Sequence, residues 1–412
     1  MNIYLCIIIG ALLLEFILFN LSRHLDLQNI STNLPNEFKG YYSPNEYARS
    51  QEYLVENSRF SYLTSAVDLL IVLLVILLGI FNNVDLWLRD FGFSPMITGL
   101  LFFGVLFLFQ DIIGTPFSLY RTFIIEEGFG FNKTTPKTYV VDKLKSYFLL
   151  ILLGGFTLFL ILVFFNKFGE YAWLYAWVAL SAILVLAQPL FTSVIAPMFN
   201  KFTPLEDGEL KNEINAFAEK VNFPLSRIDV MDGSRRSSKS NAYFSGLGKN
   251  KRIALFDTLI EKHSVEELVS IIAHEVGHYK KKHNIKGIIM GVVQTGIMFY
   301  LLSLFINNEN LFAAFKMENV SIYASLLFFS ILYSPIELIM SFLANAISRK
   351  HEFEADAFAK TSIGTGKDLI EGLKKLTVTN LGNLTPHKLT VWLNYSHPPV
   401  LSRIKALDNL GK

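Results

Sequence analysis

The chain of 412 residues contains one cysteine, Cys6, and few charged residues. A single cysteine excludes an intrachain disulfide and a thiolate zinc site, so a bound metal needs histidine and carboxylate ligands. Charged residues make up 17% of the chain, against about 25% in an ordinary soluble domain. The formal net charge is only +2 and no basic domain stands out, so we expect no nucleic-acid partner.

The fraction of hydrophobic residues is correspondingly high. The chain is 52% hydrophobic, with a mean hydropathy of +0.39. A helix crosses a bilayer with about 20 residues, and seven stretches are long and apolar enough to do so. They run approximately from 2–22, 62–82, 94–114, 147–166, 171–192, 286–306 and 322–345. We therefore predict an all-α multispanning membrane protein that contacts membrane lipid.

Two polar segments divide these spans into four regions. Residues 1–192 hold spans one to five, 193–285 form a first polar segment, 286–345 hold spans six and seven, and 346–412 form a second polar segment. In the first polar segment, 205–222 has the pattern of an amphipathic helix, and 227–231, 242–244 and 252–256 have that of short strands. Turn residues at 246–250 predict a hairpin between the last two strands. The polar segments should together form a small α+β part.

Residues 271–279 carry the clearest chemical motif, H-E-x-x-H, at His274, Glu275 and His278. Two histidines four residues apart on a helix share one face and can bind one metal ion, for which zinc is suited. Ser264 and Glu267 predict a capping box that starts this helix. Glu275 can reach a metal-bound water and take its proton, which is the chemistry of a zinc peptidase.

The third zinc ligand is expected in the second polar segment. Glu352 and Asp356 lie four residues apart and share a helix face, whereas Glu354 points away from it. We predict Glu352 as ligand and Asp356 as the hydrogen-bond partner of a ligating imidazole. The alternative is an exposed acidic helix start paired with Arg349 and Lys350. Three other histidines, His263, His283 and His387, are predicted to lie at the surface.

Two further features concern the substrate. His397, in a proline-containing turn, could donate to an oxyanion, and Arg403 could bind a carboxylate, although a structural role is as plausible for His397. Asn241, Ala242, Tyr243 and Phe244 read as an edge strand, to which an extended peptide can add.

Charge in the loops predicts the orientation. Loops on the side of the N-terminus carry three lysines and arginines and those on the other side carry nine, so the N-terminus should face out and both catalytic segments and the C-terminus should face the cytoplasm. The three are Arg89, Lys167 and Lys316; the nine are Arg23, Lys39, Arg49, Arg59, Arg121, Lys133, Lys137, Lys143 and Lys145. Polar residues within the spans should face a polar interior; they are Glu15, Asp68, Gln110, Asp111, Gln188, Gln294 and Glu337. For Asp111 a structural ion pair is an equal alternative.

Five motifs follow one another along the chain: N-K-F-T-P (200–204), S-K-S-N-A-Y-F (238–244), H-E-V-G-H (274–278), E-F-E-A-D-A-F-A-K (352–360) and S-H-P-P (396–399). With them the chain resembles the type 1 integral-membrane CAAX prenyl proteases, in order and over nearly its whole length. The resemblance implies seven helices around a chamber and endoproteolysis beside a prenylated cysteine. It also implies one Zn²⁺ per chain on His274, His278 and Glu352, with Glu275 as base, Asp356 behind the ligands, and Asn241, His397 and Arg403 around the substrate.

One difference from the eukaryotic members of this family concerns the organism and membrane in which the protein occurs. Eukaryotic members carry a charged insertion before H-E-x-x-H, whereas residues 259–273 are compact here, which favours a bacterial cytoplasmic membrane over an endoplasmic reticulum membrane. The substrate is then a peptide or protein whose prenylation stays open. Alternatives are a broad membrane quality-control protease and, in another class, a transport or scaffold protein with a structural metal. The intact Glu275 argues against the last, because a structural site needs no base.

Overall fold

Seven long helices dominate the computed structural model, which describes residues 2–245 and 251–411. The turn predicted at 246–250 lies outside the described residues. The number of spans is confirmed for the described part of the chain. They are α1 (Ile3–Gln28), α2 (Pro44–Leu77), α4 (Pro95–Tyr120, continued by a π-helical turn), α5 and α6 (Pro136–Leu149 and Phe156–Lys167, joined through a π-helical turn), α7 (Ala172–Leu190), α12 (His283–Phe305) and α14 (Ile322–Ile363).

The apolar surface of these helices is not buried within the protein. In every span, at most 17% of the most apolar window is buried, and side chains such as Ile151 and Ile112 are 75% and 70% exposed. Exposed apolar surface costs about 25 cal/mol per Å² in water, a cost that hydrocarbon removes. The spans are therefore shaped for lipid, and the protein is a multi-pass integral membrane protein.

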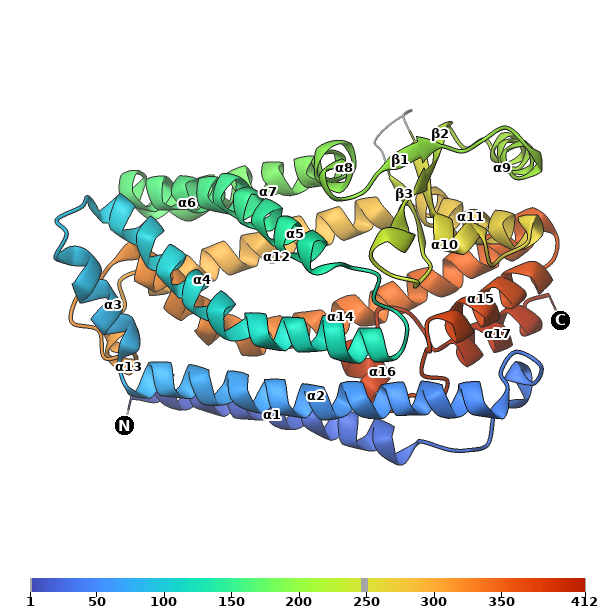
Figure 1. The fold of residues 1–412 in the computed structure, drawn as a ribbon. Helices are drawn as coiled ribbons and strands as arrows, with labels where there is room; N and C mark the ends of the chain where they lie inside the picture. Colours follow the sequence, from blue (N-terminus) through green and yellow to red (C-terminus); the bar gives the residue numbers. More distant parts are fainter. Residues whose placement is uncertain (1, 246–250, 412) are drawn as a thin grey trace.

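The two ends of the molecule are built from different elements (Figure 1). The N-terminus lies beside α3 (Ile80–Arg89) and α13 (Glu309–Ala314), where Asn2 Nδ2 donates to the Asn310 carbonyl at 2.6 Å. Stacked and edge-on aromatic rings fill this end, among them Phe81, Phe315 and Phe328. The sheet, the H-E-x-x-H helix and the C-terminus lie at the opposite end, as an odd number of spans requires.

The seventh span does not end where hydropathy predicts. The apolar run stops near residue 345, yet α14 continues without a break to Ile363 and is 42 residues long. A helix satisfies its own backbone hydrogen bonds, so it can leave the bilayer and continue beside other protein segments. The second polar segment therefore begins inside a helix, and α14 carries residues 352–356 directly from the membrane.

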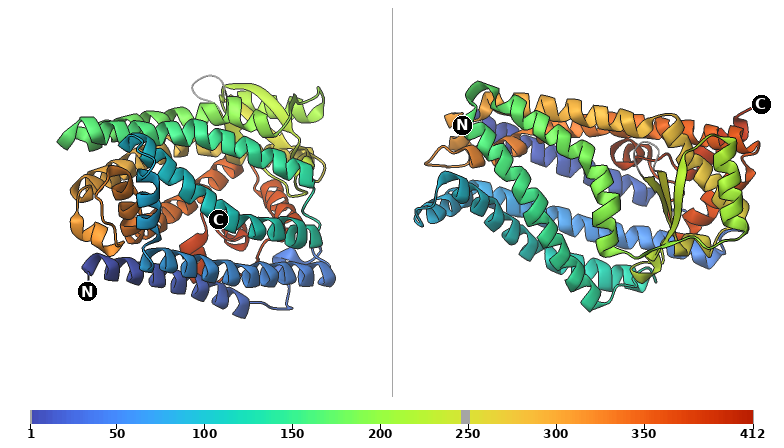
Figure 2. Two further views of the ribbon diagram at one scale, coloured as in Figure 1. Left: turned by 60° about the vertical axis from the view of Figure 1, so that its left-hand side comes forward. Right: turned by 90° about the horizontal axis from the view of Figure 1, so that it is seen from above.

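A four-stranded sheet forms the centre of the small α+β part (Figure 2). The strand order is β1 (Phe202–Pro204), β2 (Leu225–Met231), β4 (Lys251–Phe256) and β3 (Ala242–Ser245). β2 and β4 are parallel, while β1 and β3 pair antiparallel to them. The three predicted strands are confirmed, and β3 is an edge strand as predicted. The three-residue β1 was not predicted, because it is too short to show an alternating pattern.

Helices cover this sheet and bury its apolar side. The core contains Ile214 from α9 (Glu209–Lys220), Leu255 from β4, Ile272 and Val276 from α11 (Val265–Lys280), and Leu369 from α15 (Lys367–Thr379). The predicted capping box at Ser264 and Glu267 starts α11. Smaller helices complete this end: α8 (Ala196–Phe199), α10 (Asp257–Ile260), α16 (Lys388–Asn394) and α17 (Val400–Asn409).

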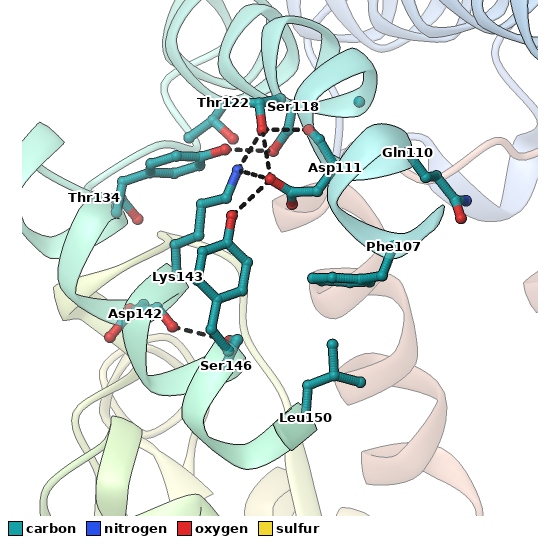
Figure 3. Close-up of a pocket in the computed structure, with 14 residues that line it drawn as sticks. Phe107, Gln110, Asp111, Ser118, Thr122, Thr134, Asp142, Lys143, Ser146 and Leu150 are labelled. Carbon is teal, nitrogen blue, oxygen red and sulfur yellow. Dashed lines mark hydrogen bonds and ion pairs between the residues drawn. The ribbon is translucent and has the colours of Figure 1, made fainter. Parts of the chain in front are cut away.

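Polar residues within the spans line cavities between the helices. Asp68 and Gln110 line a cavity of about 590 Å³ between α2, α3, α4 and α14. Asp111 lines another, of about 760 Å³, between α4 and α5, where its carboxylate pairs with Lys143 at 2.9 Å and accepts a hydrogen bond from Tyr147 at 2.6 Å (Figure 3). The side chain of Gln188 lies outside the described part. Asp68, Gln110 and Asp111 thus line cavities, as predicted for residues of this kind, and Asp111 also forms the ion pair that was its alternative.

Candidate active site

The two motif histidines lie on the buried side of α11, and a close helix crossing holds them next to α14. Gly277 lies between them, and a Cβ atom built on it would meet the Ala355 Cα at 3.0 Å and the Ala355 carbonyl oxygen at 3.1 Å. Such distances are tighter than nine in ten real Cβ contacts, and backbone atoms cannot easily give way, so glycine favours this close approach. The crossing brings the turn of α14 that holds Glu352 against the H-E-x-x-H turn of α11.

Three potential metal ligands meet at this crossing. His274 Nε2 and His278 Nε2 lie 3.1 Å apart, and the two Glu352 oxygens lie 3.4 and 3.3 Å from them. One ligand atom from each residue falls within 4.8 Å of the other two. The side chains are only 9%, 17% and 5% exposed. Two imidazoles and one carboxylate, mutually close and buried, form a donor set typical of catalytic zinc.

The hydrogen bonding of Glu352 fits a bound cation. Glu352 Oε2 is buried and accepts no hydrogen bond from the described residues, although His274 Nε2 and an Arg403 guanidinium nitrogen each lie 3.4 Å from it. An unsatisfied buried carboxylate oxygen is costly unless a cation compensates it. The side chains of His274, His278 and Glu352 therefore fit a bound metal cation.

Asp356 and Arg403 lie directly behind the first ligand. The His274 Nδ1 atom is 2.8 Å from Asp356 Oδ1, which leaves Nε2 free for a metal. The Arg403 guanidinium donates to both oxygens of Asp356, at 2.8 and 2.6 Å. Burial would lower the pKa of Arg403, but its pairing with Asp356 raises that pKa and keeps the guanidinium charged. Arg403 already has this partner within the protein, so the geometry favours an internal role over the predicted substrate carboxylate.

Glu275 neighbours the first ligand on α11. Burial raises the pKa of its carboxyl above the usual value. A carboxylate with a raised pKa holds a transferred proton more readily, which suits a general base operating near neutral pH.

His397 approaches the ligand cluster from the loop between α16 and α17. Its Nε2 atom lies 3.3 Å from Glu352 Oε1, and its Nδ1 atom lies 2.9 Å from the Ser396 hydroxyl. The His397 side chain remains 64% exposed, in contrast to the buried ligands. His397 therefore contacts the ligand cluster and is at the same time accessible to a molecule that approaches from outside.

The predicted peptide-binding strand also lies near α11. β3 contacts that helix, and Phe244 packs edge-on against Tyr279 with ring centroids 6.2 Å apart. The Asn241 carbonyl accepts the Phe256 N–H at 3.1 Å, and Tyr243 lies opposite Ala254 on β4. β4 pairs with one side of β3, and among residues 2–245 and 251–411 no strand pairs with its other side, where an extended chain could add.

The burial of two histidines and the contact made by Glu354 differ from what the sequence predicted. His263 and His283, predicted at the surface, are only 8% and 5% exposed. Glu354 turns away from the three ligand atoms, but it contacts His283 rather than only solvent. The sequence did not reveal this pair, because His283 and Glu354 lie 71 positions apart.

Comparison with known proteins gives matches over nearly the whole chain. Residues 23–201 match the family model described as CAAX prenyl protease N-terminal, five membrane helices, and residues 204–410 match peptidase family M48. CAAX prenyl protease 1 of Saccharomyces cerevisiae is 34% identical, over 98% of this chain and 95% of its own. The mouse CAAX prenyl protease 1 homolog is 33% identical, over 95% of this chain and 92% of its own.

A solved structure extends the similarity to three dimensions. The crystal structure of S. mikatae Ste24p matches with a TM-score of 0.94 and 33% identity, covering 98% of this chain and 99% of that one. Both polar segments and all seven spans fall within the matched region. The chain therefore belongs to the CAAX prenyl protease 1 family of M48 peptidases and is an integral-membrane metalloendopeptidase.

Proposed function

We propose that the metal is zinc, one ion per chain, held by His274, His278 and Glu352. The observation that carries this proposal is that one ligand atom each from His274, His278 and Glu352 lies within 4.8 Å of the other two, at a site where these side chains are largely buried. When bound, zinc supplies a Lewis acid that polarises water and a peptide carbonyl.

The protein's own side chains handle the protons. Glu275 accepts a proton from the attacking water while the water oxygen bonds to the scissile carbonyl carbon. Glu275 then returns that proton to the amine nitrogen as the C–N bond breaks. His397, exposed at the edge of the cluster, donates a hydrogen bond to the oxyanion formed in between. Residues 241–244 of the β3 edge hold the peptide in extended form.

The substrate proposed is a protein or peptide with a prenylated cysteine near its C-terminus. The relatives' printed name supports this substrate, and the apolar lining of the cavity between α2, α4 and α14 is compatible with an isoprenoid chain. We further propose that the catalytic end faces the cytoplasm, from the loop charges, in a bacterial cytoplasmic membrane or, in a eukaryote, the endoplasmic reticulum.

Matched peptides would test this proposal. The purified full-length protein in detergent would receive two peptides ending in the same CAAX sequence, one farnesylated and one not. We expect cleavage after the farnesylated cysteine, its loss with a zinc chelator, and its return with added zinc. Equal cleavage of both peptides would overturn the substrate proposed. Restoration by another divalent ion but not by zinc would overturn the metal proposed.

A further inference from the structure

The second metal-ligand histidine has a buried partner that begins the next helix. α11 ends at Lys280 and α12 begins at His283, with Lys282 between them in the left-handed region at φ 58°. This tight turn directs the His283 ring back toward α11, where His283 Nδ1 lies 3.0 Å from His278 Nδ1. The two rings meet nearly perpendicular, at 74°, with centroids 5.1 Å apart.

Metal ligation fixes which atom donates in this contact. His278 Nε2 is the nitrogen that faces His274 and Glu352, so a metal there uses its lone pair. A neutral imidazole then carries its proton on Nδ1. His278 Nδ1–H must therefore donate, and His283 Nδ1 must accept. The proton of His283 is left on Nε2.

Glu354 lies where that proton needs an acceptor. Its Oε2 atom is 3.0 Å from His283 Nε2, and its side chain is 32% exposed while the His283 side chain is 3% exposed. The Lys350 side chain is 77% exposed and its Nζ atom lies 3.9 Å from Glu354 Oε1, so His283 is the closer partner of the carboxylate. The hydrogen bonds thus run in one direction, from His278 to His283 to Glu354.

We propose that His283 and Glu354 are positioning residues for the metal ligand His278. The other ligand, His274, contacts the Asp356 carboxylate directly, while His278 reaches a carboxylate through one intervening imidazole. Such outer partners fix the orientation of a ligating ring and increase its basicity. This inference rests on the metal site of the proposed function and deepens it.

Packing alone offers a competing account. His351 stacks on His283 with centroids 3.9 Å apart and planes within 10°, so His283 could simply fill space between α12 and α14. Phenylalanine can retain that stacking but has no ring nitrogen. Substitution by phenylalanine at 283 and at 351 therefore separates hydrogen bonding from packing.

The experiment measures zinc affinity of the full-length protein by competition with a chelator of known zinc affinity, together with kcat and KM for a cleaved peptide. His283→Phe should weaken zinc binding about 10–100-fold, and Glu354→Ala about 10-fold. The double variant should resemble His283→Phe, because Glu354 acts through His283. His283→Asn, whose side-chain oxygen can accept from His278, should recover part of the affinity. KM should change little.

His351→Phe is the matched control and should keep wild-type zinc affinity. Unchanged zinc affinity in His283→Phe, or an equal loss in His351→Phe, would overturn the proposal. If His283→Phe does not fold, Glu354→Ala decides, since wild-type affinity in that variant overturns the carboxylate's role. A wild-type protein that binds no zinc would instead overturn the proposed function, and this inference with it.

Discussion

Three carboxylates within five residues of α14 have different surroundings because of their angles around the helix. Glu352 and Asp356 are four residues apart and face α11, one toward both motif histidines and the other toward His274 Nδ1. Glu354 lies about 200° from Glu352 at 100° per residue. It still contacts a polar group, because His283 reaches it from the start of α12.

Glu275→Gln should separate metal binding from catalysis. The three metal-ligand side chains are unchanged, so the variant should keep its metal, while loss of the base should reduce kcat by about 10²–10⁴-fold. Metal content and peptide cleavage, measured on one preparation, check both expectations. Near-normal turnover would remove Glu275 from the role of base.

Alanine substitutions at 352 and 356 should have unequal effects. Glu352→Ala removes a proposed ligand and should abolish most zinc binding and all activity. Asp356→Ala removes a partner of His274 and should weaken zinc affinity about 10–100-fold while retaining some metal. Zinc content of the two purified variants is the measurement. Retention of zinc by Glu352→Ala beside its loss in Asp356→Ala would reverse the two assignments.

At the scale of elements, the site depends on how two helices cross. α11 brings the motif and α14 brings the carboxylates, and the absence of a side chain at Gly277 allows their backbones to approach. A glycine within a helix costs about 1 kcal/mol relative to alanine, so this position gives up helix stability in exchange for close packing.

Gly277→Ala tests this crossing. The added Cβ would meet backbone atoms of Ala355, so overpacking should destabilise the protein by about 1–3 kcal/mol and weaken metal binding by moving Glu352. Gly287→Ala on α12 is the control, because a Cβ there meets nothing within 4 Å. Thermal unfolding and metal content of both variants are compared with the wild type. Equal stability of the two would show that the crossing tolerates a side chain.

The β3 edge makes a structural prediction about bound substrate. One side of the strand pairs with β4 and the other can accept an extended chain. A peptidomimetic inhibitor should form main-chain hydrogen bonds with residues 241–244 while its scissile-bond mimic lies at the cluster. A structure of the complex checks this, and a ligand that reaches the cluster without contacting the strand would refute it.

At the scale of the whole molecule, one continuous helix joins the membrane to the site. α14 enters from the end that holds the N-terminus and reaches the sheet end with Glu352 and Asp356 already in place. His283 likewise lies at the start of span α12. The site is thus assembled at the ends of spans, where the bundle meets the α+β part.

Reporter fusions test the proposed orientation. Fusions at the C-terminus and within the loop 307–321 should report opposite sides of the membrane, with the C-terminus cytoplasmic, because the sheet end carries the excess of positive loop charge. Cytoplasmic reporters at both positions would contradict a membrane crossing by α14, and with it the count of seven spans. A translocated C-terminus with a cytoplasmic loop would reverse the orientation.

Patterns among neighbouring residues were sufficient to predict many of this protein's structural elements. Runs of apolar residues predicted seven spans, alternation predicted three strands, and the capping box predicted the start of α11. The H-E-x-x-H spacing and the four-residue spacing of Glu352 and Asp356 predicted shared helix faces. These features depend on residues within one or two helical turns, so the sequence contains them directly.

Contacts between distant segments required the tertiary structure. Hydropathy ended the seventh span near 345, because it measures preference for lipid and not the continuation of a helix against α11. His283 was predicted at the surface, and Glu354 was predicted only to point away from the face of Glu352 and Asp356. The neighbours of each residue in sequence do not reveal their contact, because the two lie 71 positions apart. Arg403 similarly finds Asp356 only when α17 packs beside α14. The sequence alone determined the ligands' spacing, whereas the crossing of α11, α12 and α14 decided which side chains surround them, because those contacts form only when separate helices pack.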